Sequence, residues 1–314
     1  MKLTDMKIQD RPQKVLVYGA PKTGKSLLVG KLAEYGYKLY WFDGDNGIDV
    51  LFQLPEEARN NIEVYPIRDL GDKQEFAKLS NEFAAYRDFS VCETHGAVNC
   101  ILCKAQKLPR SEFKWEEVND NPKAVIVFDS ISQLVSSVQN YIARNDSFDD
   151  FGSVNKESKR EWGHYMAQNL VLGKFFSMVQ NAMCKIVCIS HETELDAEKN
   201  PAMKLTIPTG GTSTQSKAVS KYFGHIVHCR IKTNMHGIVS GTMSDPNAVA
   251  GSRLNVDVAS SSRGLAALFE VVGNTVAALP ASASTVETSA TTSAQATNTS
   301  TSSQLEALKA RIKK

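Results

Sequence analysis

Residues 14–26 read KVLVYGAPKTGKS, and they are the most informative part of the chain for its fold. Its first part, KVLVY, is an apolar run typical of a buried strand, and the rest matches the pattern G-x-x-x-x-G-K-S. The glycines let backbone N–H groups approach phosphates, Lys25 reaches the β- and γ-phosphates, and the Ser26 hydroxyl ligates Mg²⁺. The sequence therefore predicts an ATP site made of consecutive residues: Gly19, Ala20, Pro21, Lys22, Thr23, Gly24, Lys25, Ser26 and Leu27.

Other short apolar runs along the chain resemble KVLVY. They lie at residues 39–42, 62–67, 124–128, 186–189 and 226–231. Helical patterns separate several of them, at residues 25–35, 74–87 and 164–178. Such alternation predicts βαβ units and an α/β fold with a mainly parallel central sheet covered on both faces. The later runs 254–258 and 266–272 predict two further strands.

Composition sets limits on the class of protein. The 314 residues are 42% hydrophobic and 22% charged, which excludes a wholly disordered or coiled-coil chain. No apolar run reaches the ~18 residues that span a bilayer, and the first residues carry no secretory signal. We therefore expect a cytoplasmic protein without a membrane partner. The net charge of +2 neither requires nor excludes a nucleic-acid partner.

Acidic residues follow two more of the predicted strands. In KAVIVFDS, Asp129 follows the apolar run and stands at the position that holds the magnesium shell in P-loop ATPases, although this aspartate could instead cap the next helix. LYWFDGDNGID places Asp43, Asp45 and Asp49 after the strand at 39–42. One of these carboxylates can polarise the water that attacks the γ-phosphate.

The order of these motifs resembles the RecA-like ATPase core. GAPKTGKS, WFDGD, VIVFDS and VCISHE stand in the places of the P-loop, the catalytic acid, the Walker-B strand and the phosphate sensor. The resemblance implies Asp45 as the water-activating acid and His191 as the γ-phosphate sensor. Because the family usually has the longer glutamate here, Asp43 is the alternative acid. A strand-end histidine without a ligand is the alternative for His191.

With its polar tail, the chain looks like the phage-encoded ATPases of the Sak type, which are associated with single-strand annealing. This resemblance implies ATP-dependent binding of single-stranded DNA, a homo-oligomer (ring or filament) with ATP between subunits, and a single-strand-binding protein as partner. It also implies a basic residue acting in trans, for which Arg263 is the candidate and Arg253 the alternative. A helicase-like hexameric motor, a loader ATPase and a small-molecule P-loop kinase are the competing functions.

Two loops are candidates for contact with DNA. Residues 145–162 combine basic side chains with Trp162, which suits a phosphate backbone and a stacked base, although a solvated charged face is the alternative. Residues 191–211 end in glycines and are longer than an ordinary connection. The candidate contacts share a positive charge: Lys156, Lys159, Arg160, Lys204 and Lys217.

Residues 88–114 interrupt the strand and helix alternation and are predicted to be an insertion. They contain the spacing C-x2-H-x4-C-x2-C at Cys92, His95, Cys100 and Cys103. Two close pairs of soft ligands separated by a turn can converge on one tetrahedral ion, which predicts a structural Cys3His zinc site. Incidental thiols beside a surface histidine are the alternative. The remaining cysteines lie in or beside apolar strands and are expected to pack as small hydrophobes: Cys184, Cys188 and Cys229.

The last part of the chain differs in composition from the rest. Residues 280–303 are rich in Ser, Thr and Ala and have no aromatic side chain, so they predict a flexible linker. In residues 304–314, Leu305, Leu308 and Ile312 share one helical face beside basic residues, which predicts a short partner-binding helix. We therefore expect the ATPase domain to occupy residues 1–279.

Overall fold

The computed structural model describes the chain in several stretches. These are residues 12–70, 73–145, 162–194, 206–211, 213–232, 235–239, 250–252, 258 and 261–270. All of them lie in the unit Met1–Gly273. Several predictions fall outside the described residues: the linker 280–303, the helix 304–314, Arg253, and the candidate DNA contacts Lys156, Lys159, Arg160 and Lys204.

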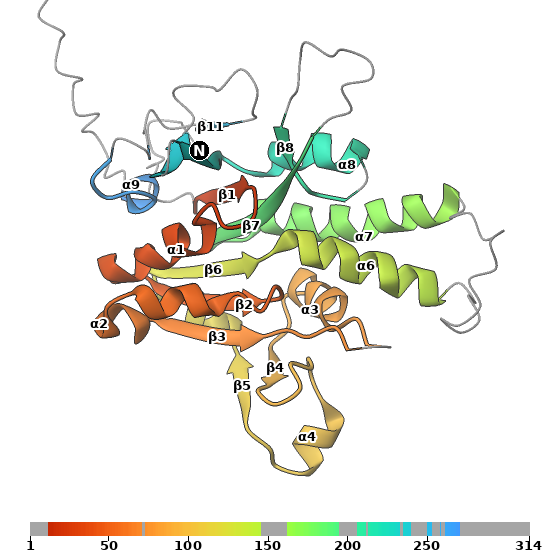
Figure 1. Ribbon diagram of the computed structural model, residues 1–314. Helices are drawn as coiled ribbons and strands as arrows, with labels where there is room; N and C mark the ends of the chain where they lie inside the picture. Colours follow the sequence, from red (N-terminus) through yellow and green to blue (C-terminus); the bar gives the residue numbers. More distant parts are fainter. Residues whose placement is uncertain are drawn as a thin grey trace, which may run out of the picture. The chain divides into compact units, whose positions relative to one another are not determined.

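Within the described residues, nine strands form the central sheet (Figure 1). Its main path is β10-β9-β1-β7-β6-β2-β3, and β8 and β11 pair with β7 and β9. The bounds are β1 Lys14–Gly19, β2 Lys38–Asp43, β3 Ile62–Pro66, β6 Ala124–Asp129, β7 Lys185–Glu194, β8 Thr206–Pro208, β9 His225–Lys232, β10 Met235–Val239 and β11 Gly251–Ser252. The six strands from β9 to β3 are parallel, which confirms the predicted α/β class.

Alternate side chains of the central strands enter two separate cores. In β1, Leu16 and Tyr18 belong to one hydrophobic cluster, and Val15 and Val17 belong to the other. This alternation follows from the two-residue period of a strand, and burial on both faces explains why the strands are continuously apolar. The sheet therefore needs a helical layer on each side.

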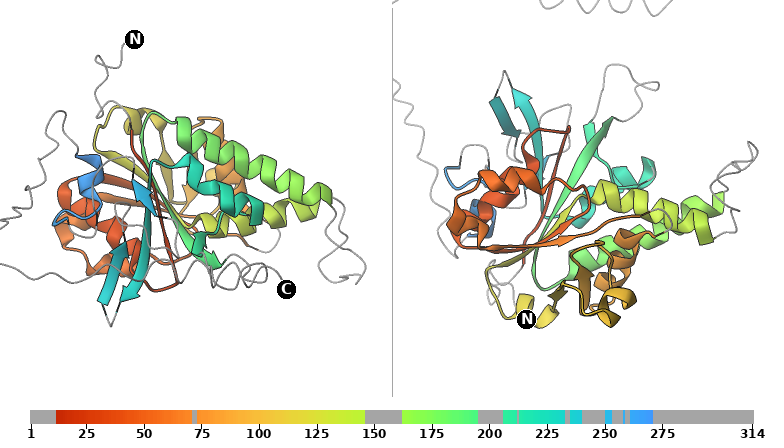
Figure 2. Two further views of the ribbon diagram at one scale, coloured as in Figure 1. Left: turned by 90° about the horizontal axis from the view of Figure 1, so that it is seen from above. Right: turned by 60° about the horizontal axis from the view of Figure 1, so that its bottom comes forward.

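Each face of the sheet has its own set of helices (Figure 2). The first face carries α3 (Glu75–Ala84), α6 (Ile131–Asn145), α7 (Trp162–Asn181) and η6 (Val219–Tyr222), which follows α8 (Ser213–Ala218). The second face carries α1 (Lys25–Gly30), η3 (Lys31–Tyr35), η4 (Ile48–Gln53), α2 (Glu56–Arg59) and α9 (Ala266–Phe269). The helix predicted for residues 25–35 is therefore α1 followed by a 3-10 helix.

The predicted insertion forms a small lobe of its own (Figure 1). A separate two-stranded sheet pairs β4 (Phe89–Cys92) with β5 (Arg110–Phe113), and α4 (Ile101–Ala105) and α5 (Trp115–Asn119) complete the segment. Phe89 and Phe113 stack on each other and also contact Phe42 of β2. The base of the insertion thus shares the core of the ATPase domain.

The strand predicted for residues 266–272 is wrong. Ala266–Phe269 is the short helix α9, which follows a turn in which Gly264 has a φ of +51°. Leu265, Ala266 and Leu268 are buried in the second core. A short apolar run fits a strand or a buried helical turn equally well, so hydrophobicity alone does not distinguish them. Of the other late strand, residues 254–257 lie outside the described residues and Val258 lies in a turn.

Candidate functional site

The P-loop curls around the side chain of Lys25 at the end of β1. Its ammonium donates hydrogen bonds to the carbonyl oxygens of Gly19 (3.0 Å) and Ala20 (2.8 Å), and the Thr23 hydroxyl donates to Ala20 (2.8 Å). Lys25 is buried, and this burial lowers the pKa of its ammonium. The loop therefore holds a cation where a phosphate chain would bind.

Gly19 is the residue at which the loop leaves the sheet. It is in register with His191 of β7 on one side and Cys229 of β9 on the other. Its φ is +156°, and a Cβ atom here would lie 2.1 Å from the carbonyl oxygen of Cys229. Only glycine fits, because the backbone of the neighbouring strand occupies the position of a side chain.

Two aspartates lie next to the P-loop at the ends of adjacent strands. Asp43 of β2 and Asp129 of β6 are register partners, and the Ser26 hydroxyl donates to Oδ2 of Asp129 (2.8 Å). Burial raises the pKa of Asp129 to about 7, and the charges of Asp45 and Asp43 add to the increase. Burial likewise raises the pKa of Asp43. Two buried carboxylates with raised pKa values are a site that a cation would stabilise.

A magnesium ion fits these residues. Asp43 Oδ2 is buried and has no hydrogen-bond partner among the described residues, while Oδ1 accepts a bond from the Gly47 backbone N–H (3.1 Å). Ser26 and Asp129 would hold the ion. Bound there, Mg²⁺ would offset the charge of the carboxylates and the nucleotide phosphates.

Asp45 and His191 form a pair at the same edge of the sheet. Nε2 of His191 lies 3.2 Å from Oδ2 of Asp45, and both side chains are partly exposed. Burial favours a higher pKa for Asp45, but hydrogen bonds with His191 and Ser130 outweigh it and hold the pKa below its usual value. The surroundings of Asp45 therefore favour its ionised form, whereas burial favours protonation of Asp43.

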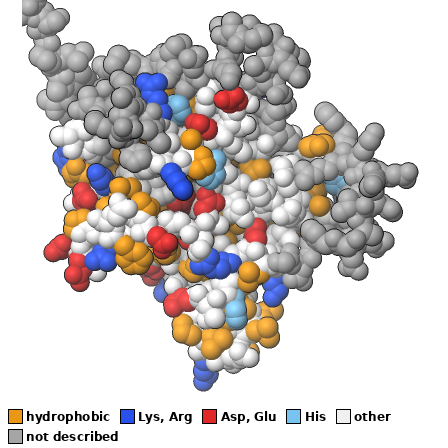
Figure 3. All heavy atoms as spheres, in the orientation of Figure 1, with side chains coloured by type: hydrophobic (Ala, Val, Ile, Leu, Met, Phe, Trp, Pro, Cys, Tyr) orange, Lys and Arg blue, Asp and Glu red, His pale blue; other side chains and the backbone are white. Residues whose placement is uncertain are grey.

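The position of His191 depends on residues that the sequence did not single out. Its backbone N–H donates to the Ser132 hydroxyl (2.9 Å), and the neighbouring Ser190 hydroxyl donates to the Thr209 carbonyl (2.8 Å). Figure 3 shows basic, acidic and histidine side chains gathered on the face where β2, β6 and β7 end. No sequence pattern marks Ser132 for this role, because its partner is 59 residues away.

The two remaining described candidates lie elsewhere. Nη2 of Arg263 donates to Oε1 of Glu270 (2.6 Å), and its guanidinium lies 5.1 Å from the centre of the Tyr35 ring. Arg263 is thus engaged within its own chain beside η3. Lys217 is exposed on α8. In the described part of the chain, neither side chain has a hydrogen bond or an ion pair with Asp43, Asp45 or Asp129, so the roles of both remain predictions.

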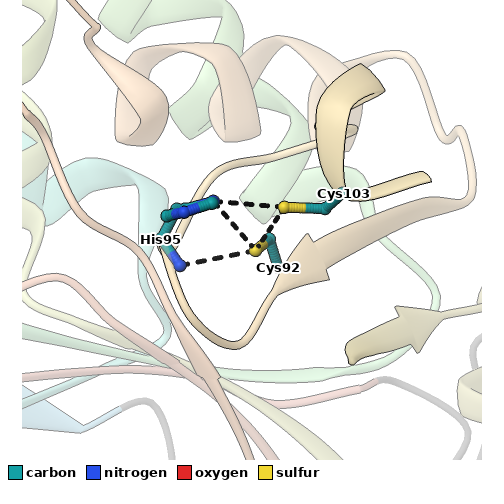
Figure 4. Close-up of side chains that lie close together, drawn as sticks. All are labelled: Cys92, His95 and Cys103. Carbon is teal, nitrogen blue, oxygen red and sulfur yellow. Dashed lines mark hydrogen bonds between the residues drawn. The ribbon is translucent and has the colours of Figure 1, made fainter. Parts of the chain in front are cut away.

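Three of the four predicted zinc ligands lie together in the insertion (Figure 4). The Cys92 and Cys103 sulfurs are 2.9 Å apart, and Nδ1 of His95 lies 3.4 Å from Cys92 and 3.1 Å from Cys103. Cys92 ends β4, His95 lies in the following turn, and Cys103 comes from α4. The three side chains would suit a thiophilic metal ion such as zinc.

Cys100 departs from the predicted arrangement. It is not part of the group whose ligand atoms all lie within 4.8 Å of one another. The backbone N–H of Cys103, with smaller effects from the Cys103 thiol and the Leu102 N–H, lowers the pKa of the Cys100 thiol. Cys100 precedes the first turn of α4, where backbone N–H groups have no partner within the helix and can interact with its thiol. Cys184, Cys188 and Cys229 are buried, as predicted.

The chain has distant matches among solved structures. No curated protein matches the chain. Matching solved structures include the RadB recombinase (12% identity, 72% of this chain, 79% of that chain, TM-score 0.35). Another is an ATPase of the type III secretion system of pathogenic bacteria (11% identity, 70% of this chain, TM-score 0.38). This match spans about half of that ATPase chain, 52%. Both likenesses are too distant to carry an argument about activity.

Among the described residues, no helix combines the length and the apolar character needed to cross a membrane.

The family match covers residues 11–254, which include the P-loop, Asp45, Asp129, His191 and the whole Cys/His insertion. The geometry at the strand ends is that of a nucleotide site with the residues of a P-loop ATPase. The chain therefore belongs to the AAA_24 family of AAA domains.

Proposed function

We propose that this protein hydrolyses ATP between adjacent subunits of a homo-oligomer and binds single-stranded DNA in recombination or strand annealing. The observation that carries the proposal is the convergence of two pairs at one sheet edge. Ser26 meets Asp129, and Asp45 meets His191, although 103 and 146 residues separate the partners. A binding site alone needs the first pair, whereas hydrolysis also needs an ionised acceptor such as Asp45.

Each residue then has a defined task. Lys25 binds the phosphate chain, and Ser26 with Asp129 holds Mg²⁺. Oδ2 of Asp45 accepts the proton of the attacking water. Nε2 of His191 contacts the Asp45 carboxylate. When ATP binds, Nε2 would leave Asp45 and contact the γ-phosphate instead. Arg263 of a neighbouring subunit would supply positive charge after release from Glu270.

The path from the sensor to the DNA loop is short. His191 lies on β7, which ends at Glu194, and β8 returns from Thr206 and pairs with the end of β7. The candidate DNA contact Lys204 belongs to the connection between these two strands. A movement of His191 would therefore shift the end of β7 and the start of the loop that contains Lys204. DNA bound by that loop could in turn change the position of His191, which supports DNA-dependent hydrolysis.

The proposal includes three further elements. Zn²⁺ is the structural cofactor, held by the Cys/His cluster of Cys92, His95 and Cys103 together with Cys100. The segment 304–314 docks a single-strand-binding protein through its apolar and basic side chains. The protein acts in the cytoplasm, which is the host cytoplasm for a phage-encoded protein.

One experiment tests the proposed function. ATP hydrolysis is measured with and without single-stranded DNA, and complexes on that DNA are sized by ultracentrifugation. We expect DNA to raise the rate and to carry oligomers, with Lys25→Ala inactive in both respects. Hydrolysis that DNA leaves unchanged, without oligomers, would favour a loader or a small-molecule kinase. Translocation that separates strands would favour a helicase-like motor.

A further inference from the structure

The turn that carries two of the clustered ligands closes on itself. The Gly96 N–H donates to the Cys92 carbonyl (2.7 Å), and the Cys92 N–H donates to the Ala97 carbonyl (3.0 Å). His95 lies inside this turn. A metal ion held by Cys92 and His95 would therefore fix the turn from within, since both ligands belong to it.

The same turn is fastened to the connection between β3 and α3. The Arg68 N–H donates to the Gly96 carbonyl (3.1 Å), and the Val98 N–H donates to Oε2 of the buried Glu75 (2.7 Å). Gly96 has a φ of +64°, and a Cβ atom there would lie 2.6 Å from Cγ of Arg68 and 2.8 Å from its backbone nitrogen. Lys78 also donates to the Val98 carbonyl. The turn thus lies directly against the stem of Arg68.

The β3–α3 connection in turn contacts the loop that carries Asp43 and Asp45. Ile67, which precedes Arg68, donates its N–H to the Asp43 carbonyl (2.8 Å). At the start of α3, Phe76 packs on Gly44 so closely that a Cβ atom there would lie 2.4 Å from its ring. The charge of Arg68 favours the ionised form of Asp43 and so opposes the burial that raises the pKa of this carboxyl.

We propose that the Cys/His cluster is a Zn²⁺ site that fixes Arg68 beside Asp43, on the loop that also carries Asp45, so that the metal supports ATP turnover and not nucleotide binding. Cys92, His95 and Cys103 supply three ligands, and Cys100, which lies at the start of α4 three residues before Cys103, would complete a closed tetrahedral site on metal binding. Arg68 is a positioning residue. Loss of the metal would release the turn, free Arg68 and loosen the loop that carries Asp45.

The turnover part of this inference rests on the proposed function, whereas the metal part does not. Metal analysis of full-length protein purified without chelator should find one zinc per chain, and Co²⁺ substitution should give the absorption of a thiolate-bound ion. Cys92→Ser and Cys103→Ser should abolish both signals, while Cys184→Ser, at a buried cysteine outside the cluster, should retain them. A wild-type protein without metal, or a Cys92→Ser variant that retains it, overturns the site.

The coupling is tested with the metal in place. Arg68→Gln and Gly96→Ala should each keep one zinc and lower kcat about tenfold, with the KM for ATP within about twofold, and Arg68→Lys should restore most of kcat. Cys92→Ser should likewise lower kcat while leaving the KM for ATP nearly unchanged. Gly96→Ala tests the coupling even if Cys92→Ser fails to fold. Wild-type kcat in zinc-loaded Arg68→Gln and Gly96→Ala overturns it. A wild-type protein that never hydrolyses ATP contradicts the proposed function and the coupling, and the metal analysis then still decides the zinc site.

Discussion

The nucleotide site and the Cys/His cluster are built in opposite ways. In the first, Ser26 bonds to Asp129 and Asp45 to His191, so the partners are 103 and 146 residues apart. In the second, the sulfurs of Cys92 and Cys103 are 11 residues apart in the chain. A site whose ligands lie within 11 residues of one another depends mainly on local backbone geometry, whereas a site at strand ends needs the register of the whole sheet.

The two sites also differ in their electrostatics. The nucleotide site gathers buried carboxylates, and burial raises the pKa values of Asp43 and Asp129. The cluster gathers two thiols and an imidazole that lie within hydrogen-bond distance of one another. The first suits a hard cation that accompanies phosphates, and the second suits a soft structural ion. Changes at the first should therefore act on catalysis directly, and changes at the second should act through local order.

The largest effect is expected from Lys25→Ala. This variant removes the ammonium that would meet the phosphate chain, so kcat/KM for ATP should fall by at least about a hundredfold. The measurement is steady-state phosphate release. Lys31→Ala, at an exposed position of η3, is the matched control and should keep the wild-type rate. Equal rates for the two variants would contradict the assignment of the P-loop.

Asp45→Asn should separate binding from turnover. An amide does not accept the proton of the attacking water, so kcat should fall about a hundredfold or more while a fluorescent ATP analogue still binds. Asp43→Asn is the paired variant. If Asp43→Asn instead causes the selective loss of turnover, the catalytic acid has been placed two residues too late.

A smaller effect of defined sign is expected for stability. Because the pKa of Asp129 is raised to about 7, the folded protein binds more protons than the unfolded chain between about pH 4 and pH 7. The free energy of unfolding that this group contributes therefore falls as the pH rises through that window. Without Mg²⁺, Asp129→Asn should be more stable than the wild type at pH 7.5, by on the order of 1 to 2 kcal/mol, and similar near pH 4.

Asp45→Asn provides the opposite sign for the same measurement. The pKa of Asp45 is lowered, so its stabilising contribution is present above the ordinary aspartate pKa and is lost as the pH falls through the lowered value. Urea unfolding at several pH values should show Asp45→Asn less stable than the wild type at pH 7.5. If Asp129→Asn and Asp45→Asn change the free energy of unfolding in the same direction, the opposite pKa shifts assigned to the two aspartates are wrong.

The smallest effect is expected when a chelator removes the metal from the cluster. Hydrogen exchange should increase in residues 89–113, because the turn that Cys92 and His95 close is released. The buried strand β1 should keep its protection, since its hydrogen bonds are to β7 and β9. Increased exchange across both regions would mean that the two sites form one cooperative unit and would remove the contrast between them.

Much of the nucleotide site was predictable from the sequence. The positions of β1, β2, β6 and β7 follow from their apolar runs, and the P-loop pattern is specific enough to place Lys25 and Ser26. The spacing of Cys92, His95 and Cys103 predicted their grouping, because a turn brings such neighbours together. Ser132, Arg68 and Glu75 carried no such signal, since their importance comes from distant partners.

The α/β class, the phosphate loop and the grouping of Cys92, His95 and Cys103 follow from the sequence alone, because hydrophobic periodicity and short spacings act over a few residues. Only the tertiary structure decided three other matters. It made α9 a helix, since the second core buries that apolar run as a turn. It distinguished Asp45 from Asp43 by burial and by the contact with His191. It placed Arg68 under Gly96, because the packing of the insertion on β3 and α3 joins segments that no local pattern connects.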